Sequence, residues 1–338
     1  MKKGNGQFLS AEVPMTIGET KDQALHLATH SGWYRYERCG EDWVKAGRAL
    51  TFWQMSCIQV DPEDALRVYI GTEHSGMFVS NDGGKDWLRA KPNVPCLTMS
   101  SMLALSGKLL VGTMPAALYY RTDAGGWQEL KGVRQGAAGG VFPPNPDLPA
   151  RTRVLAKEQD NGGRLFAGIE VAGILTSDDE GQSWQSANQG LTDPDIHQIL
   201  PSKKTPGLVV TACGEGVSRS RDRGSHWEKV TPAGNRNYGN ALAEDDEGNI
   251  YLGITQDRPR TWTRAGRANS AVFKSRDGAN WQLLTENMTG GIMDVCRAPG
   301  KGILAATADG EVVIVSPSGD TRKIVDGLPC ITAMALGA

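Results

Sequence analysis

The sequence predicts an all-β fold in which seven four-stranded blades close into a ring, a seven-bladed β-propeller, and three observations support it. An octapeptide of the form Ser-x-Asp-x-Gly-x-x-Trp occurs three times, at residues 80–87, 177–184 and 220–227. Short apolar runs ending in Gly-Thr or a similar pair recur around the octapeptides, with turn residues between them. The C-terminal segment reads as a strand that the first unit lacks. Repeated units of short strands with turn residues between them are typical of β-propellers.

The octapeptide is explained by local turn chemistry. Its Asp side chain supplies hydrogen bonds within a turn, and its Gly accepts a positive φ that other residues resist. Its Trp is large and apolar, so we expect it to pack into the seam between neighbouring sheets. Weaker copies lie at residues 39–43, 122–127 and 275–281. In the last two, Trp127 and Trp281 arrive one residue early, which predicts distorted turns.

The octapeptide resembles the Asp box, also called the BNR repeat, found in sialidases, two-propeller xyloglucanases, sortilin-type receptors and photosystem assembly factors. The resemblance covers almost the whole chain, and it implies a propeller. A sialidase is disfavoured, because the chain lacks the Arg-Ile-Pro motif which that family carries near its start. Since propellers host many unrelated activities, the resemblance informs the architecture more than the chemistry.

The units are counted from the second strand of each predicted blade. These strands are residues 24–29, 68–72, 109–113, 165–169, 208–211, 250–254 and 303–307. No innermost strand precedes the first one, since residues 1–20 match the pattern poorly and are assigned to an N-terminal extension. Residues 330–336 resemble the first strands of other units, so we expect them to complete blade 1 and close the ring. The whole chain, 1–338, is predicted to be a single propeller domain.

Composition limits which partners and which cellular compartment we expect. The net charge is −2, from 36 basic and 38 acidic side chains, which gives no electrostatic case for a nucleic-acid or membrane partner. Six cysteines occur without Cys-x-x-Cys spacing, which favours buried free thiols in a reducing compartment. No apolar stretch follows the N-terminal lysines, so no secretory signal is expected. We therefore expect a cytoplasmic protein; its oligomeric state is left open.

Two insertions indicate where a site lies. In a four-stranded blade, the turns from the second to the third strand share one face with the connections between blades, and the octapeptides lie on the opposite rim. Trp-to-Trp spacings show extra residues at 131–150 and 255–270, and both insertions fall on the first of these faces. Loops of this length in a compact repeat fold are uncommon unless functional or disordered. We therefore expect a ligand on that face.

The second insertion has a composition suited to an anionic ligand. It contains four arginines, including Arg258 and Arg260, together with Asp257 and Trp262. Guanidinium groups bind carboxylate, sulfate or phosphate, and the Trp ring suits an apolar or sugar face. A solvated charged loop would have the same composition, so both interpretations stay open.

Two histidines occupy the same turn position in adjacent units. His30 and His74, with Glu73 beside the second, would act as a general base or as ligands of a divalent metal. Glu170 lies in the corresponding turn of a later unit. Exposed turn histidines inherited by duplication are the structural alternative. No cofactor is otherwise expected.

The channel is predicted to be lined by polar residues from the innermost strands. By alignment of the repeats, these are Gln59, Thr98, Arg153, Gln198, Asn240, Asp294 and Thr332. His197 and Tyr238 lie near the entrance. Arg153 beside Asp294, His197 and Tyr238 would neutralise a carboxylate, while the histidine and the tyrosine pass protons. Water filling of the channel is the simpler explanation of the same polarity.

Three function classes follow. The first is a carbohydrate-active enzyme for an anionic ligand, either a glycoside hydrolase that uses paired carboxylates or a uronate lyase. The second is a non-enzymatic binding or assembly propeller, which needs only an exposed patch such as Phe52, Trp53, Phe142 and Trp262. The third is a metal-dependent hydrolase or lyase that uses the loop histidines.

Overall fold

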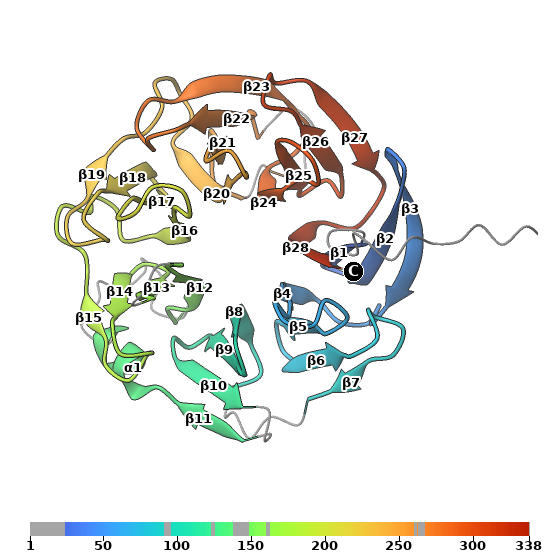
Figure 1. Ribbon diagram of the computed structural model, residues 1–338, viewed down its shortest axis with the longest axis horizontal. Helices are drawn as coiled ribbons and strands as arrows, with labels where there is room; N and C mark the ends of the chain where they lie inside the picture. Colours follow the sequence, from blue (N-terminus) through green and yellow to red (C-terminus); the bar gives the residue numbers. More distant parts are fainter. Residues whose placement is uncertain are drawn as a thin grey trace, which may run out of the picture.

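The chain forms a ring of seven sheets around a central axis (Figure 1). A computed structural model describes residues 24–90, 96–122, 126–137, 149–159, 163–259, 262 and 268–337. Every sheet has four antiparallel strands, and the sheets follow one another around the ring in sequence order. The predicted seven-bladed, all-β fold is therefore confirmed.

The strands of each blade are given from the ring axis outward. Blade 1 contains β28 (Ile331–Gly337), β1 (Ala24–Thr29), β2 (Gly32–Cys39) and β3 (Asp42–Ala49). Blade 2 contains β4 (Met55–Val60), β5 (Val68–Thr72), β6 (Met77–Ser80) and β7 (Leu88–Arg89). Blade 3 contains β8 (Met99–Leu105), β9 (Lys108–Thr113), β10 (Leu118–Thr122) and β11 (Trp127–Glu129). Blade 4 contains β12 (Thr152–Lys157), β13 (Leu165–Ile169), β14 (Gly173–Ser177) and β15 (Gln185–Ser186).

The remaining blades follow the same order. Blade 5 contains β16 (Ile196–Pro201), β17 (Val209–Cys213), β18 (Gly216–Ser220) and β19 (Glu228–Lys229). Blade 6 contains β20 (Tyr238–Glu244), β21 (Ile250–Thr255), β22 (Ser270–Ser275) and β23 (Gln282–Met288). Blade 7 contains β24 (Ile292–Arg297), β25 (Ile303–Thr307), β26 (Val312–Val315) and β27 (Thr321–Val325).

The C-terminal strand closes the ring, as predicted. β28 pairs antiparallel with β1, with Leu27 opposite Met334. The neighbouring blade also holds this strand, because the carboxylate of Asp294 in β24 accepts the backbone N–H of Met334 at 2.8 Å. The two ends of the described chain thus share one sheet, which removes the exposed edges of an open array.

The apolar core lies between blades. Each of the seven seams has its own cluster of buried residues, for example Val154, Phe166 and Val209 between blades 4 and 5. Packing therefore stabilises each blade through its two neighbours, as expected for a repeat architecture.

The octapeptide turns have the predicted hydrogen bonds. In the first turn, Ser80 Oγ accepts the N–H of Gly84 at 2.7 Å, and Asp82 accepts the N–H of Asp86 at 3.0 Å. The turns at Ser177 and Ser220 repeat both contacts. The indole N–H of Trp87 donates to Gly84 O at 3.1 Å, but among the described residues those of Trp127 and Trp281 have no partner. In the copy at residues 275–281, the early Trp281 therefore lacks the indole hydrogen bond that Trp87 and Trp184 make to their turn glycines.

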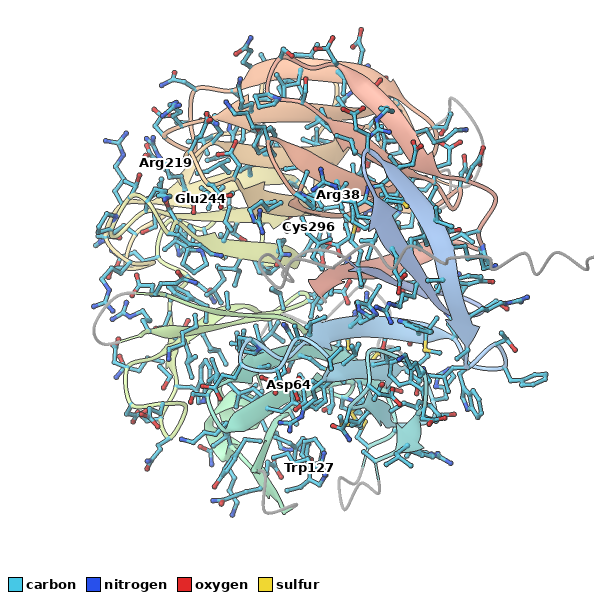
Figure 2. All side chains as sticks on the ribbon, turned by 45° about the vertical axis from the view of Figure 1, so that its right-hand side comes forward. Arg38, Asp64, Trp127, Arg219, Glu244 and Cys296 are labelled. Carbon is cyan, nitrogen blue, oxygen red and sulfur yellow. The ribbon has the colours of Figure 1, made fainter. Side chains whose placement is uncertain are left out.

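A basic side chain from the preceding blade reaches several of these turns. Arg35 donates to Gly83 O at 3.0 Å, Arg164 to Arg223 O at 2.8 Å, and Arg219 to Asp277 O at 2.9 Å. Arg219 lies on the outer part of the ring (Figure 2). All three acceptor carbonyls immediately precede the turn glycine, so the repeated turn also links blades.

Every innermost strand carries a β-bulge near its first residue. The bulged residues are Thr332, Ser56, Ser100, Arg153, His197, Asn240 and Met293, in blades 1 to 7. Several of these side chains bond a carbonyl of the next blade, such as Thr332 to Met55 O at 3.1 Å and Asn240 to Ile292 O at 2.9 Å. We call the end of the ring axis at which the innermost strands begin the mouth. Because a bulge re-aims a side chain, the bulged residues determine which side chains lie at the mouth.

The insertion at 131–150 begins with α1 (Lys131–Ala137), where the sequence predicts only a connection. Val133 of this helix is buried in the seam between blades 3 and 4. Residues 138–148 lie outside the described part of the chain. No helix in the described ranges is long and apolar enough to cross a membrane.

Candidate functional site

Charged and titratable side chains gather at two repeating positions in three consecutive blades. One position is the bulged residue, and the other lies two residues before it. In blades 4, 5 and 6 this pair is Arg153 with Arg151, His197 with Asp195, and Asn240 with Tyr238. In the other blades the pairs are Met293 with Gly291, Thr332 with Cys330, Ser56 with Gln54, and Ser100 with Thr98. The candidate site therefore lies on one side of the mouth, over blades 4 to 6.

Arg153 departs from the bonding pattern of the other bulged residues. Its Nη2 donates to Asn240 Oδ1 at 3.1 Å, so the side chain passes blade 5 and reaches blade 6. Its Nη1 donates to Glu170 at 3.0 Å, in the turn between β13 and β14. Arg151 donates to the same carboxylate through Nε, and through Nη2 at 3.1 Å. Two guanidinium groups thus converge on one carboxylate at the mouth.

His197 and Tyr238 form a buried pair beside these arginines. Nδ1 of His197 lies 2.6 Å from Gly239 O, and because a carbonyl only accepts, Nδ1 carries a proton. Nε2 is 3.1 Å from the Tyr238 hydroxyl and 3.3 Å from Asp195 Oδ1. This Asp195 oxygen has no hydrogen bond among the described residues. His197 Nε2 therefore faces both the phenol of Tyr238 and the carboxylate of Asp195.

The charges of the site shift its titrations. Burial opposes ionisation of Glu170, but Arg153 and Arg151 outweigh it and lower the pKa of this carboxyl. Burial also opposes ionisation of Asp195, while His197, Arg153 and Arg258 hold its pKa below the usual range. Burial raises the pKa of Tyr238 to about 12. Burial and the neighbouring Arg151 lower the pKa of Arg153, and they outweigh the opposite effect of Glu170, Tyr238 and Asp195.

The second insertion contributes in a different way from that predicted. Trp262 is only 2% exposed, so its ring is not available to a ligand; it packs edge-on against Tyr238 at 5.5 Å and supports that side chain. Its indole N–H donates to Asp257 O at 2.8 Å. Asp257 and Arg258 are exposed, and the charge of Arg258 acts on Asp195 and Tyr238. Arg260 lies outside the described residues.

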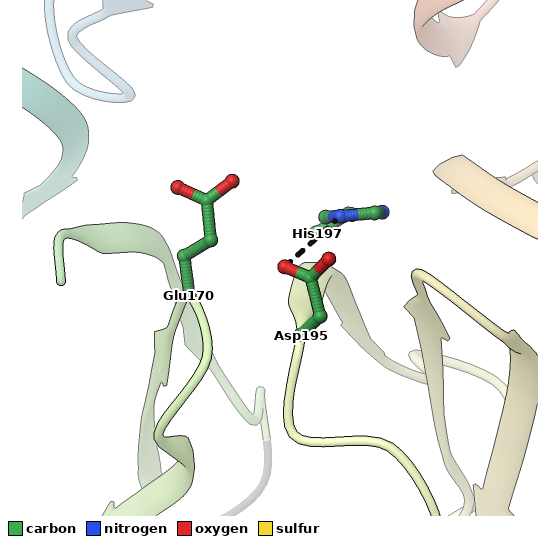
Figure 3. A group of neighbouring side chains, drawn as sticks. All are labelled: Glu170, Asp195 and His197. Atoms are coloured by element: carbon green, nitrogen blue, oxygen red, sulfur yellow. Dashed lines mark ion pairs between the residues drawn. The ribbon is translucent and has the colours of Figure 1, made fainter. Parts of the chain in front are cut away.

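One group of side chains has the composition of a metal site. Ligand atoms of Glu170, Asp195 and His197 lie within 4.8 Å of one another (Figure 3). A divalent cation would have to draw Glu170 away from two guanidinium groups before all three could coordinate it. His30 and His74 are exposed on blades 1 and 2 and do not belong to this group. Glu73 is half-buried, and its carbonyl accepts the Thr98 hydroxyl.

Other predicted site residues lie elsewhere. Asp294 follows the bulge in β24 and bonds the closing strand, away from the cluster over blades 4 to 6. Gln59 lies three residues beyond the bulge in β4 and donates to Val60 O at 2.8 Å. Trp53 packs against Phe78, with ring centroids 5.0 Å apart, and is only partly exposed. The bulges at Met293 and Ser56 shift the register of these two strands, and the sequence pattern does not reveal that shift.

Arg151 and Asp195 complete the cluster, and neither was predicted as a site residue. Each lies two residues before a bulged residue and therefore reaches the same part of the mouth. The signal was present as Arg-x-Arg at residues 151–153 and Asp-x-His at residues 195–197. Spacing of two in an extended segment places side chains on one face.

Comparison with known proteins shows where this fold recurs. No protein-family model matches the chain. A probable oligoxyloglucan-reducing end-specific xyloglucanase from Neosartorya fischeri is 22% identical over 249 residues. This match covers 66% of the present chain and 29% of the fungal protein. The chain thus spans less than a third of the curated relative that it matches.

Solved structures share the architecture. The GH74 xyloglucanase from Xanthomonas campestris superposes with a TM-score of 0.59 at 15% identity, covering 80% of this chain and 45% of that one. The structure of YCF48 bound to D1 peptide superposes with a TM-score of 0.55 at 17% identity, covering 90% and 92%. At these identities the likeness shows the fold alone. The chain is a seven-bladed β-propeller similar in fold to GH74 enzymes and to YCF48.

Proposed function

We propose that the mouth over blades 4 to 6 binds a small anionic ligand, with acidic sugars as the best-fitting class. One observation carries the proposal: Arg153 reaches across blade 5 into a cluster with Arg151 and the buried Tyr238–His197 pair. The lowered pKa of Arg153 supports it, because an added negative charge nearby would be favourable. The similarity to xyloglucanases supports the sugar component.

The electrostatics favour elimination over hydrolysis as the chemistry of such a site. Hydrolysis by paired carboxylates needs one protonated carboxyl as the general acid. The pKa values of Glu170 and Asp195 are both lowered, so both are ionised near neutral pH. In elimination from a uronate, arginine neutralises the carboxylate, which acidifies the adjacent C–H. The two-carboxylate glycoside hydrolase therefore has less support here than the uronate lyase.

The proton path in that reaction uses Tyr238 and His197. A base removes the proton next to the carboxylate, a carbon–carbon double bond forms, and the β carbon–oxygen bond breaks. The leaving oxygen then takes up a proton. Because the His197 side chain is fully buried, it would act through the Tyr238 hydroxyl, and Asp195 would stabilise the imidazolium.

The test compares acidic and neutral oligosaccharides in thermal-shift and calorimetric titrations. A bound ligand at one hundred times its dissociation constant raises the free energy of unfolding by about 2.7 kcal/mol. We expect this effect for oligomers containing glucuronate or galacturonate, and its loss in Arg153→Gln. Arg276→Gln is the matched control, because this exposed arginine lies in an octapeptide-like turn on the opposite rim. Equal binding of neutral and acidic sugars would contradict the proposal.

Turnover is tested separately. Elimination creates a double bond conjugated to the carboxylate, which ultraviolet absorbance detects. Tyr238→Phe should abolish this signal and leave binding within a few-fold of wild type. Binding without turnover in the wild-type protein would support a binding function alone.

A binding or assembly propeller without catalysis is the second candidate. YCF48 corresponds to the chain over 90% and 92% of the two lengths, whereas the GH74 structure is covered by less than half. Phe52, 92% exposed, and Leu97, 48% exposed, offer apolar contacts. This candidate predicts that neither acidic nor neutral sugars bind in these assays. It also predicts that peptides bind and that Phe52→Ser weakens their binding.

A further inference from the structure

The carboxylate of Glu170 occupies the donors that an anionic ligand would use. It accepts hydrogen bonds from Nε and Nη2 of Arg151 and from Nη1 of Arg153. Bidentate pairing of this kind is the preferred way in which guanidinium binds a carboxylate. A ligand carboxylate approaching Arg151 or Arg153 therefore meets a site that the protein has already filled.

This ion-pair cluster lies at an accessible place. The side chains of Arg151, Arg153 and Glu170 are 30%, 22% and 24% exposed. Arg153 has a second anchor in Asn240, which is itself 5% exposed and bonded to the backbone of blade 7. Arg153 would thus keep its position if Glu170 moved away. Glu170 can therefore leave while Arg153 stays in place.

The turn that carries Glu170 is strained. Ala172 N–H donates to Ile169 O at 3.0 Å, which makes Glu170 and Val171 the central residues of a tight turn. Val171 has φ of +64°. A β-branched residue rarely adopts a positive φ, because its side chain crowds the backbone in the left-handed conformation. Moving the turn would release this strain, which partly offsets the loss of the ion pairs.

We propose that Glu170 is an internal substitute for the acidic group of the ligand. It pairs with Arg151 and Arg153 when no ligand is bound, and the ligand carboxylate displaces it by moving the turn at Val171. This inference rests on the proposed function, since it assumes that the ligand is anionic. Because a ligand must displace Glu170 from the two arginines, the site would select against neutral ligands and against weakly bound anions.

The displacement should be visible in affinity. If the two arginines are free for only a few per cent of the time, the apparent affinity is reduced by that fraction, so removing the competitor should tighten binding about tenfold or more. Conversely, glycine accepts a positive φ without strain, so Val171→Gly should stabilise the present turn and weaken binding about fivefold.

The experiment titrates glucuronate and, separately, inorganic sulfate into the full chain by calorimetry. The variants are Glu170→Gln, which keeps the shape of the side chain, Glu170→Ala, and Val171→Gly. Asp309→Asn is the matched control, because this half-buried acid lies in the corresponding turn of blade 7, away from the arginines. Far- and near-ultraviolet circular dichroism verifies that each variant is folded.

The outcomes separate the two proposals. Tighter binding by both Glu170 variants and unchanged binding by Asp309→Asn supports displacement, including the case in which wild type shows no measurable binding. Binding by wild type with equal or weaker binding by both Glu170 variants overturns displacement and leaves the proposed function standing. Absence of binding by every folded protein refutes the proposed anionic ligand, and displacement with it.

Discussion

Replacing Asp294 by Asn should stabilise the protein at high pH and change little at low pH. Burial raises the pKa of this carboxyl from 3.8 to about 7, and only backbone N–H groups, including that of Met334, act in the other direction. The folded state therefore holds a proton that the unfolded state has lost between these two pH values. The free energy of unfolding of wild type should fall across this interval and then stay constant above it.

The shift sets the size of the effect. At about 1.4 kcal/mol per pKa unit, it corresponds to a ceiling of about 4 kcal/mol. Part of the side chain remains accessible, so we expect about 1–2 kcal/mol after solvent screening. The Asn oxygen can still accept the Met334 N–H, which preserves the link to the closing strand. Asp294→Asn should therefore equal wild type near pH 4 and exceed it by this amount at pH 8.

Urea denaturation at several pH values measures the difference. Asp245→Asn is the control of opposite sign, because hydrogen bonds from Asn249 and Tyr251 outweigh burial and lower the pKa of Asp245. Its carboxylate stabilises the fold above the ordinary Asp pKa, and this stabilisation is lost as the pH falls through the lowered value. A difference between Asp294→Asn and wild type that does not change with pH would refute the reasoning.

Three further predictions concern single features of the ring. His26 is fully buried, its pKa is lowered to about 3 by burial, and neither ring nitrogen has a hydrogen bond in the described part of the chain, so His26→Leu should raise the free energy of unfolding by about 1–2 kcal/mol; a loss of stability in urea would contradict it. Trp262→Ala should cost about 3–5 kcal/mol and weaken anion binding through Tyr238, with Trp262→Phe intermediate; unchanged calorimetric affinity would show that Tyr238 needs no such support. Deleting residues 331–337 removes the inner strand of blade 1 and should abolish cooperative unfolding, whereas an unchanged urea midpoint would mean that the ring closes without this strand.

The blades were predictable because their information is local and repeated. A turn such as Ser80–Asp82–Gly84 encodes its own hydrogen bonds, so three copies define the unit. The closing strand was predictable by subtraction, since residues 330–336 resembled inner strands and one unit lacked such a strand.

The site was harder to predict because it depends on register between blades. A bulge adds one residue to a strand, and the sequence pattern of the repeats does not show where the extra residue lies. Arg153, His197 and Tyr238 were placed near the mouth, but Asp195 and Arg151 were not. The role of Trp262 was misassigned for a related reason: composition shows an aromatic ring in a loop, whereas only the fold shows that Tyr238 covers it.

The bulged register makes the mouth of this channel exchangeable residue by residue. Both repeating positions are charged or titratable in blades 4 and 5, blade 6 pairs Asn240 with Tyr238, and the bulged residues of blades 2 and 3 are the uncharged Ser56 and Ser100. The apolar packing of the blades lies in the seams, while Thr332 and Asn240 at the bulged position bond a carbonyl of the next blade, so a replacement that keeps such a bond should leave the ring intact. Divergence or laboratory selection could therefore retune the receptor one blade at a time, transferring an Arg-x-Arg or Asp-x-His pair to another sector of the ring while the scaffold stays unchanged.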